Sequence, residues 1–272
     1  MPISYKVHES IAYFTIDNGK VNALTPTMHK EFYEHLKRFE IDREARCGIL
    51  AAAPGKPFSV GDDLKHRPAS KRTPEQELEA YLFLHQDEGE TPSRPGWDLD
   101  VLYHRRSKPI VAAIDGYCLG KGLIYTLLHS DIRIASDRAR FGLPEIAYGM
   151  AGASGSTRLA RQLAYVDAAW LALTGEIIDA HEACRMRLVN RVVPHAELAA
   201  ESLRAARLVA RHPAIALRVE MEALANGMDL GRTEAVRHTQ NLYRLQRLGF
   251  AGHGADAAEI LPALKKAKES AR

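Results

Sequence analysis

Apolar and polar residues recur along the first half of the chain with the spacing of strands and helices in turn. Apolar, β-rich runs predict four strands, over residues 11–16, 47–52, 110–114 and 131–135. Between the first two runs, Thr25 followed by Pro26 is typical of a helix start. Apolar residues then recur at helical spacing, at Met28, Phe32, Leu36 and Phe39. We therefore expect a helix there whose apolar face lies in the core.

The rest of the chain is less regular and then becomes helical. Residues 66–100 carry the weakest pattern, with a helical piece near 75–84 and a loop over 89–96 that contains proline and glycine. From Val166 onward the pattern is almost entirely helical. Strands that alternate with helices, followed by helices alone, predict an α/β core. We assign that core to residues 1–200 and a helical C-terminal region to 201–272.

Composition excludes several classes of protein. The 272 residues are 46% hydrophobic and 26% charged, with a formal net charge of +3, as in an ordinary globular protein. The basic residues are scattered, which argues against a nucleic-acid partner. No apolar run is long enough to span a membrane, and the three cysteines lie far apart without a CxxC or other metal-ligand spacing. We expect a cytoplasmic protein with no bound metal and no membrane partner.

A glycine-rich turn follows the strand at 110–114. Gly116, Gly120 and Gly122 permit positive φ angles and the close approach of a ligand, and a helix is expected to run from there to Ser130. The free N–H groups and the dipole at such a helix start favour an anion or an oxyanion. The spacing matches neither a phosphate-binding P-loop nor a dinucleotide fingerprint. By itself, the turn is equally consistent with simple packing.

Four segments together indicate the class of protein more specifically than the glycine-rich turn does alone. They are Val21–Leu24, Phe58–Leu64, Lys108–Gly122 and Ala139–Glu145. In order and spacing they resemble the signature segments of the crotonase superfamily, the enoyl-CoA hydratases and isomerases, and the similarity covers roughly residues 5 to 200. The resemblance implies an α/β fold, a spiral of ββα units followed by a C-terminal helical trimerisation region. It also implies a homotrimer or a dimer of trimers.

The resemblance further implies a site for an acyl-CoA thioester. By position, the N–H groups of Asp62 and Lys121 would hold the thioester oxygen, with Gly122 as the alternative to Lys121. Glu145 would be the acid/base residue, and its apolar neighbours in the sequence could raise its pKa. No cofactor is expected, because the CoA is part of the substrate. The implied CoA-binding residues are Val21, Ala23, Val60, Asp62, Asp63, Leu64 and Lys65.

The sequence departs from the family pattern at the second glutamate that hydratases use. That position holds Ile124, or Tyr125 if one extra residue before Asp131 is counted, and neither is a carboxylate. Tyr125, Asp62 or a residue of 66–100 could take its place. Asp62 is itself unusual, since a carboxylate beside an oxyanion opposes enolate formation. The Asp62 side chain either points away from the oxyanion or is a second acid/base group or a group that recognises the substrate.

The reaction stays open between alternatives. Hydration and double-bond isomerisation both proceed through a stabilised enolate, and a single glutamate makes isomerisation the easier of the two to explain. A decarboxylase or hydrolase of the same family, or a non-catalytic CoA-binding homologue, is also possible. The retention of Glu145 and of both N–H-donating loops favours an enzyme. The sequence does not specify the acyl group.

Overall fold

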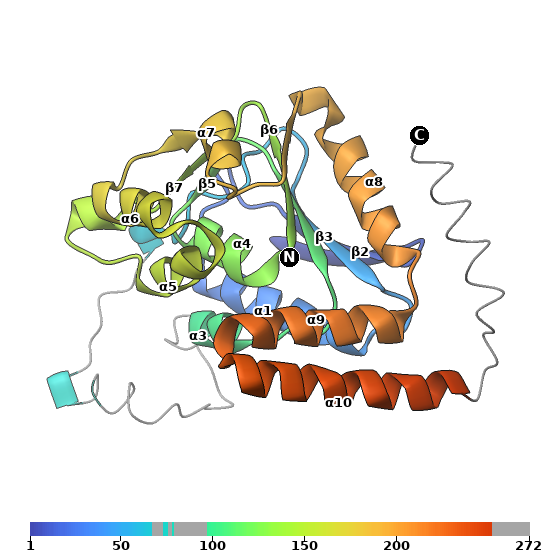
Figure 1. Cartoon of the computed structure of the whole chain (residues 1–272). Coiled ribbons are helices and arrows are strands. Elements are labelled where there is room, and N and C mark those ends of the chain that lie inside the picture. The colour runs from blue at the N-terminus through green and yellow to red at the C-terminus, as the bar shows by residue number, and fades with distance from the viewer. Residues whose placement is uncertain (67–72, 76–77, 79–96, 252–272) are drawn as a thin grey trace. The chain divides into compact units, whose positions relative to one another are not determined.

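The structure, a computed structural model, describes residues 1–66, 73–75, 78 and 97–251 (Figure 1). The chain divides into two units, Met1–Arg211 and His212–Arg272. The loop predicted at 89–96, and most of the helical piece predicted at 75–84, lie outside the described residues.

A six-stranded sheet forms the centre of the first unit. In spatial order its strands are β1 (Ile3–His8), β2 (Ile11–Ile16), β3 (Cys47–Ala52), β4 (Ile110–Ile114), β6 (Ile132–Ser136) and β9 (Arg191–Val193). β1 pairs with β2 in antiparallel fashion, and all the other pairs are parallel. Three predicted strands are confirmed at their predicted bounds, and the fourth begins and ends one residue later. β1 and β9 were not predicted.

The first unit also contains a second, smaller sheet. It contains β5 (Tyr117–Leu119), β7 (Arg140–Gly142) and β8 (Ile178–Asp179). Isolated bridges from Ser59 to Cys118 and from Leu24 to Asp62 add two more chain segments beside it. A strand of the large sheet is thus followed by an extended segment of the small one and then by a helix, as in β4, β5 and α4 (Lys121–His129). This repetition is the predicted spiral of ββα units.

Both faces of the large sheet are buried, as expected for parallel strands covered by helices. Along β4, Ile110, Ala112 and Ile114 lie in the same apolar cluster as the predicted inner face of α1 (Pro26–Ile41). The alternate residues Val111 and Ala113 lie in a second cluster, with residues of α8 (Leu198–Ala210). Figure 1 shows α8 running along the sheet beside β2 and β3. The layers are therefore helix, sheet and helix.

The remaining helices complete the two units. In the first unit they are η1 (Leu64–His66), α3 (Trp97–Tyr103), η2 (Pro144–Tyr148), α5 (Ala153–Gln162), α6 (Tyr165–Thr174), α7 (Ala180–Arg185) and η3 (His195–Glu197). The second unit contains α9 (Ala214–Asp229) and α10 (Arg232–Ala251), which pack against each other. Among the described residues, no helix combines the length and the apolarity that a bilayer crossing requires.

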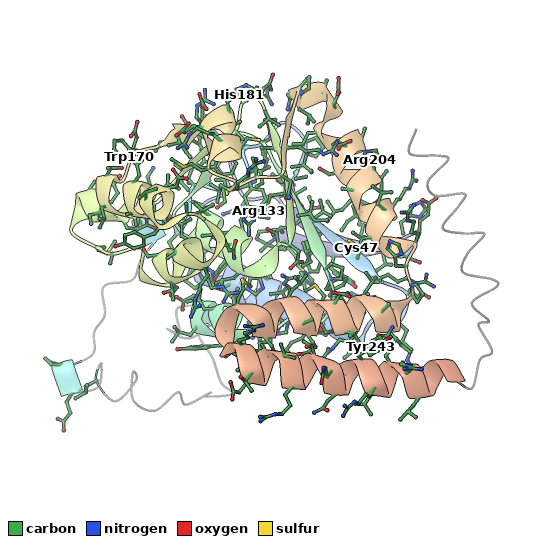
Figure 2. The ribbon with its side chains drawn as sticks, in the orientation of Figure 1. Cys47, Arg133, Trp170, His181, Arg204 and Tyr243 are labelled. Atoms are coloured by element: carbon green, nitrogen blue, oxygen red, sulfur yellow. The ribbon has the colours of Figure 1, made fainter. Side chains whose placement is uncertain are left out.

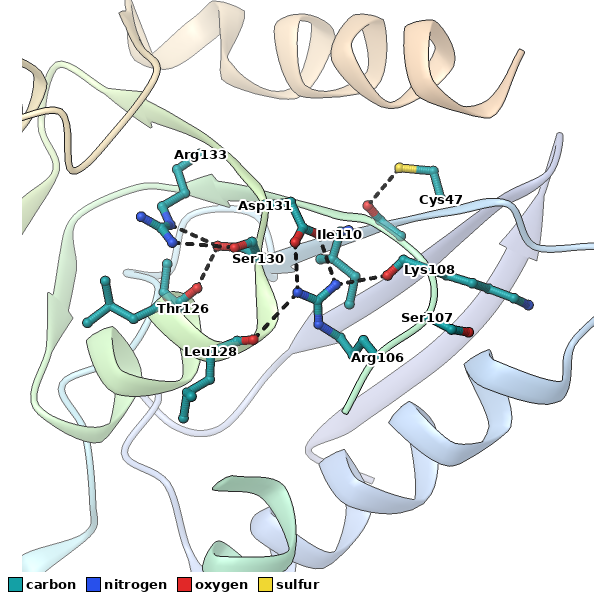
Figure 3. A network of polar contacts seen from close by, with 12 residues as sticks. Cys47, Arg106, Ser107, Lys108, Ile110, Thr126, Leu128, Ser130, Asp131 and Arg133 are labelled. Carbon is teal, nitrogen blue, oxygen red and sulfur yellow. Dashed lines mark hydrogen bonds and ion pairs between the residues drawn. The ribbon is translucent and has the colours of Figure 1, made fainter. Parts of the chain in front are cut away.

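A buried polar network fixes the end of α4 and the start of β6. Figure 2 shows Arg133 in the interior, in contrast to Arg204 on α8. Arg133 donates to Ser130 Oγ at 3.0 Å and to the Leu188 carbonyl at 3.1 Å. Nearby, Arg106 donates to both carboxylate oxygens of Asp131, at 2.9 and 3.0 Å (Figure 3). These charge-assisted bonds hold the α4–β6 connection in one conformation.

Candidate active site

The first wall of the candidate site is the loop after β3, which pairs with the segment before α1. The Leu24 N–H donates to the Gly61 carbonyl at 2.8 Å, and the Asp63 N–H donates to the Leu24 carbonyl at 2.8 Å. Ser59 Oγ accepts from the Gly61 N–H at 3.1 Å and donates to the carbonyl of Asn22 at 2.7 Å. The loop is held on both sides of Asp62, whose own N–H has no acceptor among the described residues.

The second wall is the start of α4. Gly120 precedes the helix with a φ of 52°, so Lys121 is its first residue and its N–H cannot have an intrahelical acceptor. Gly61 has a φ of 90°, and a Cβ there would lie only 3.1 Å from the Lys121 nitrogen. The Gly61–Asp62 peptide and the Lys121 N–H are therefore immediate neighbours, although they are far apart in the sequence.

Gly122, the alternative donor, lies one residue further into the helix. A Cβ on Gly122 would lie 2.9 Å from the Ser59 Cβ, so this residue packs against the loop rather than against Gly61. Among the described residues, the Lys121 N–H is, like that of Asp62, without an acceptor. An unpaired N–H at a helix N-terminus, with a second unpaired N–H from a loop beside it, favours negative charge on a ligand oxygen. The geometry thus brings Asp62 and Lys121 together and sets Gly122 apart from the pair.

Glu145 borders the same glycine turn from the next turn of the spiral. It lies in η2, and its Oε1 would be 2.8 Å from a Cβ on Gly120. Its Oε2 is buried and has no hydrogen-bond partner among the described residues. Burial, helped by the charge of Asp62, raises the pKa of the Glu145 carboxyl above its ordinary value, although its own backbone N–H and Lys121 oppose the shift. Such a carboxyl is suited to carrying a proton.

The Asp62 side chain lies among polar and charged side chains whose proximity the sequence did not predict. Its Oδ1 is 3.4 Å from His29 Nε2, and its Oδ2 is 3.8 Å from Lys121 Nζ. Lys121 Nζ in turn donates to Asp98 Oδ2 at 3.0 Å. Burial alone would raise the pKa of Asp98, but the Lys121 ammonium outweighs it and the pKa lies below its ordinary value. One feature of the sequence could have identified His29, because it is a titratable residue on the apolar, buried face of α1.

Both candidate positions for the second glutamate hold buried side chains. Ile124 is 6% exposed and packs against Gly155. Tyr125 is 4% exposed, and its hydroxyl lies 2.7 Å from His29 Nδ1. Burial, followed by the charges of Asp98 and Asp62, raises the pKa of Tyr125 well above its ordinary value. Tyr125 therefore stays protonated and is poorly placed to take a proton from a substrate.

The residues predicted to contact CoA form two neighbouring stretches, one on each side of the Leu24–Asp62 bridge. The Val60 N–H donates to the Val21 carbonyl at 3.2 Å, which joins the two stretches at one end. Val21 is 42% exposed and Leu64 is 58% exposed. Of the remaining members, Ala23, Val60 and Asp63 are partly exposed, while Asp62 and Lys65 are exposed. The structure thus gathers this predicted set on one accessible edge.

Comparisons with known proteins identify the family of the chain. The model of the enoyl-CoA hydratase/isomerase family matches residues 6–247. The chain is 31% identical to (E)-benzylidenesuccinyl-CoA hydratase of Thauera aromatica, with 91% of each protein covered. It is 32% identical to short-chain-enoyl-CoA hydratase of Clostridium acetobutylicum, over 80% of this chain and 78% of that protein.

Solved structures agree as well. The crystal structure of enoyl-CoA hydratase from Bacillus anthracis superposes with a TM-score of 0.79 at 27% identity, and the match covers 98% of this chain and 96% of that one. The chain belongs to the enoyl-CoA hydratase/isomerase family, and the resemblance drawn from its sequence motifs is confirmed. In the described part of the chain, no group of three or more histidine, cysteine or acidic residues could hold a metal ion.

Proposed function

We propose that the protein acts on an acyl-CoA thioester and stabilises an enolate on the N–H groups of Asp62 and Lys121, with Glu145 moving a proton at C2. One observation carries the proposal. The two N–H groups without acceptors adjoin Gly61, and the Glu145 carboxyl lies against Gly120 of the same turn. Donors fixed in advance around a developing negative charge are among the strongest sources of catalysis.

The chemistry follows from these three groups. When C2 gains or loses a proton, the negative charge of the enolate resides on the thioester oxygen. That oxygen would accept from the Asp62 and Lys121 N–H groups at the positive end of the α4 dipole. Because burial raises the pKa of Glu145, this carboxyl can both hold a proton and release it. The reaction requires no resident cofactor, since the CoA enters with the substrate.

The CoA would extend along the edge formed by Val21, Ala23, Val60 and residues 62–65. The exposure of Val21 and Leu64 supports this assignment. Two of the relatives described above are named as hydratases of CoA thioesters, which supports a thioester substrate. Isomerisation is a second candidate, because Ile124 stands where hydratases carry another glutamate, and one acid/base residue is sufficient to move a double bond.

The test is proton exchange at C2. The protein would be incubated in D₂O with butyryl-CoA, and with short, branched and aromatic 2-enoyl-CoA thioesters. We expect deuterium at C2 of a saturated thioester, together with hydration or isomerisation of at least one unsaturated one, as measured by mass spectrometry and NMR. Tight thioester binding without exchange above background would instead identify a non-catalytic CoA-binding homologue, and the proposal would fail.

We also propose that the protein is a homotrimer or a dimer of trimers. Its surface carries exposed apolar side chains that association with another chain would bury. On α6, Val166 is 73% exposed, Trp170 52% and Leu173 70%, and they recur at one helical face. Figure 2 shows Trp170 on the outside of α6. In the second unit, Leu224 is 64% exposed. Apolar patches of this kind are typical of association surfaces.

Light scattering after gel filtration tests the assembly. We expect a mass of three or six chains for the wild type, and smaller species for the double variant Val166→Lys, Leu173→Lys, because charges on a buried face are costly. Ile41→Lys is the matched control, since Ile41 is 80% exposed at the end of α1. A wild type with the mass of one chain would contradict the proposal.

A further inference from the structure

The carboxylate of Asp62 is the feature that the proposed reaction leaves without a role. Its backbone N–H serves as an oxyanion donor, yet its side chain is a negative charge beside that oxyanion. The structure places two nitrogen groups against the carboxylate, with His29 Nε2 at 3.4 Å and Lys121 Nζ at 3.8 Å. These offset the repulsion that a bare carboxylate would exert on an enolate. A carboxylate compensated in this way can remain beside the site.

His29 is itself held in one orientation. Its ring is almost buried, and its Nδ1 lies 2.7 Å from the hydroxyl of Tyr125. Since the raised pKa keeps Tyr125 protonated, the hydroxyl can donate to Nδ1, and the proton of a neutral imidazole is then on Nε2, the nitrogen that lies 3.4 Å from Asp62 Oδ1. The opposite tautomer would direct a lone pair at the carboxylate. Tyr125 and His29 therefore form a buried support for the Asp62 side chain.

Asp62 is also the carboxylate best placed to act together with Glu145. Its side chain is 41% exposed, so water and substrate can reach it. Its charge is one of the causes that raise the pKa of Glu145, whereas Asp98 is not among them. Asp98 is instead bound to Lys121 Nζ at 3.0 Å. Asp62 follows Gly61, and a Cβ on Gly120 would lie 3.8 Å from the Gly61 Cα and 2.8 Å from Glu145 Oε1, so Asp62 and Glu145 both border the glycine turn.

We propose that Asp62 is a second catalytic residue, which binds the attacking water and takes its proton in the hydration of a 2-enoyl-CoA thioester. It fills the role left empty by Ile124, with His29 and Tyr125 as positioning residues. This inference rests on the proposed function and narrows it to hydration. The oxygen of water bonds to C3, and its proton passes to Asp62. The C2–C3 π electrons move into the enolate, which then takes a proton at C2 from Glu145. After product release, Asp62 loses its proton to solvent and Glu145 regains one.

The variant Asp62→Asn separates the two functions of this residue, because it keeps the backbone N–H and the side-chain size but cannot accept the proton. We expect hydration of crotonyl-CoA to fall by about 100-fold or more. Exchange at C2 of butyryl-CoA, which does not require a base for water, should fall much less than hydration does. The exchange of ¹⁸O from water into the C3 hydroxyl of 3-hydroxybutyryl-CoA should fall together with hydration.

Asp17→Asn is the matched control, since Asp17 is an exposed aspartate that also pairs with a lysine, Lys56, outside the site. Its hydration rate should equal that of wild type. If Asp62→Asn hydrates as fast as Asp17→Asn, or loses hydration and C2 exchange to the same extent, the inference fails. A wild type that catalyses neither C2 exchange nor hydration would contradict the proposed function itself, so the two failures are distinguishable.

Tyr125→Phe tests the positioning residues. Without the hydroxyl, His29 can carry its proton on either nitrogen, and the tautomer with the proton on Nε2, near Asp62, is no longer favoured. We expect hydration to fall about tenfold, with a changed pH profile of kcat, while KM for crotonyl-CoA and the rate of C2 exchange are unchanged. An equal fall in both reactions would indicate only a structural role for Tyr125 and would remove His29 from the proposal.

Discussion

Replacing Glu145 by glutamine is expected to lower kcat for an enoyl-CoA substrate by about 10²- to 10⁴-fold, the usual contribution of a general acid or base. The amide keeps the size of the side chain but cannot give a proton to C2 or take one from it. Because the N–H groups of Asp62 and Lys121 are unchanged, the dissociation constant for butyryl-CoA should change less than severalfold. Steady-state kinetics with crotonyl-CoA and titration calorimetry with butyryl-CoA measure the two quantities.

The stability of the same variant provides its folding control. Burial raises the pKa of Glu145 above its ordinary value of 4.5, so the folded state binds this proton more tightly than the unfolded state does. The stabilisation from that proton is fully present below pH 4.5 and is lost as pH rises through the folded pKa. The unfolding free energy of Glu145→Gln should therefore rise relative to that of wild type between pH 4 and pH 8. At pH 8 the variant should be at least as stable as wild type. Turnover within threefold of wild type would exclude Glu145 as the acid/base residue.

The sequence allowed the prediction of those parts of the fold that depend on local pattern. The continuous apolar run along 110–114 identified β4, and Thr25 with Pro26 identified the start of α1. β1 was missed because its weaker alternation becomes a strand only by pairing with β2. β5 and β7 have three residues each and are fixed by their neighbours in the spiral. Contacts between distant segments, rather than local propensity, decide such short elements.

The candidate site shows the same division between local and distant effects. Glu145 and the glycine turn could be identified from motifs, but the contacts among His29, Asp62 and Lys121 could not, because they join three separate turns of the spiral. The stretch from Gly122 to Asp131, which includes the extra residue, forms α4 and its end. Gly120 precedes the helix, and the Ser130 N–H donates to the Thr126 carbonyl.

Replacing Gly61 by alanine is expected to lower kcat by more than the accompanying loss of stability explains. Gly61 has a φ of 90°, and a Cβ there would lie 3.1 Å from the Lys121 nitrogen and 3.0 Å from the Leu119 carbonyl oxygen. The methyl group would push the two oxyanion donors apart. Loss of one such donor usually costs about 10²- to 10³-fold in kcat, and we expect a loss of that order. The positive φ should also cost about 1–2 kcal/mol of unfolding free energy.

Gly55 offers a matched control for that strain. It has a φ of 78°, and a Cβ there would meet no atom within 4 Å. Gly55→Ala should therefore lose a similar 1–2 kcal/mol of unfolding free energy in urea but keep the turnover of wild type. The difference in kcat between the two variants isolates the contact at Lys121 from the backbone strain they share. If Gly61→Ala turns over crotonyl-CoA as fast as Gly55→Ala, then the N–H groups of Asp62 and Lys121 do not act together on one oxygen, and the proposed enolate site is wrong.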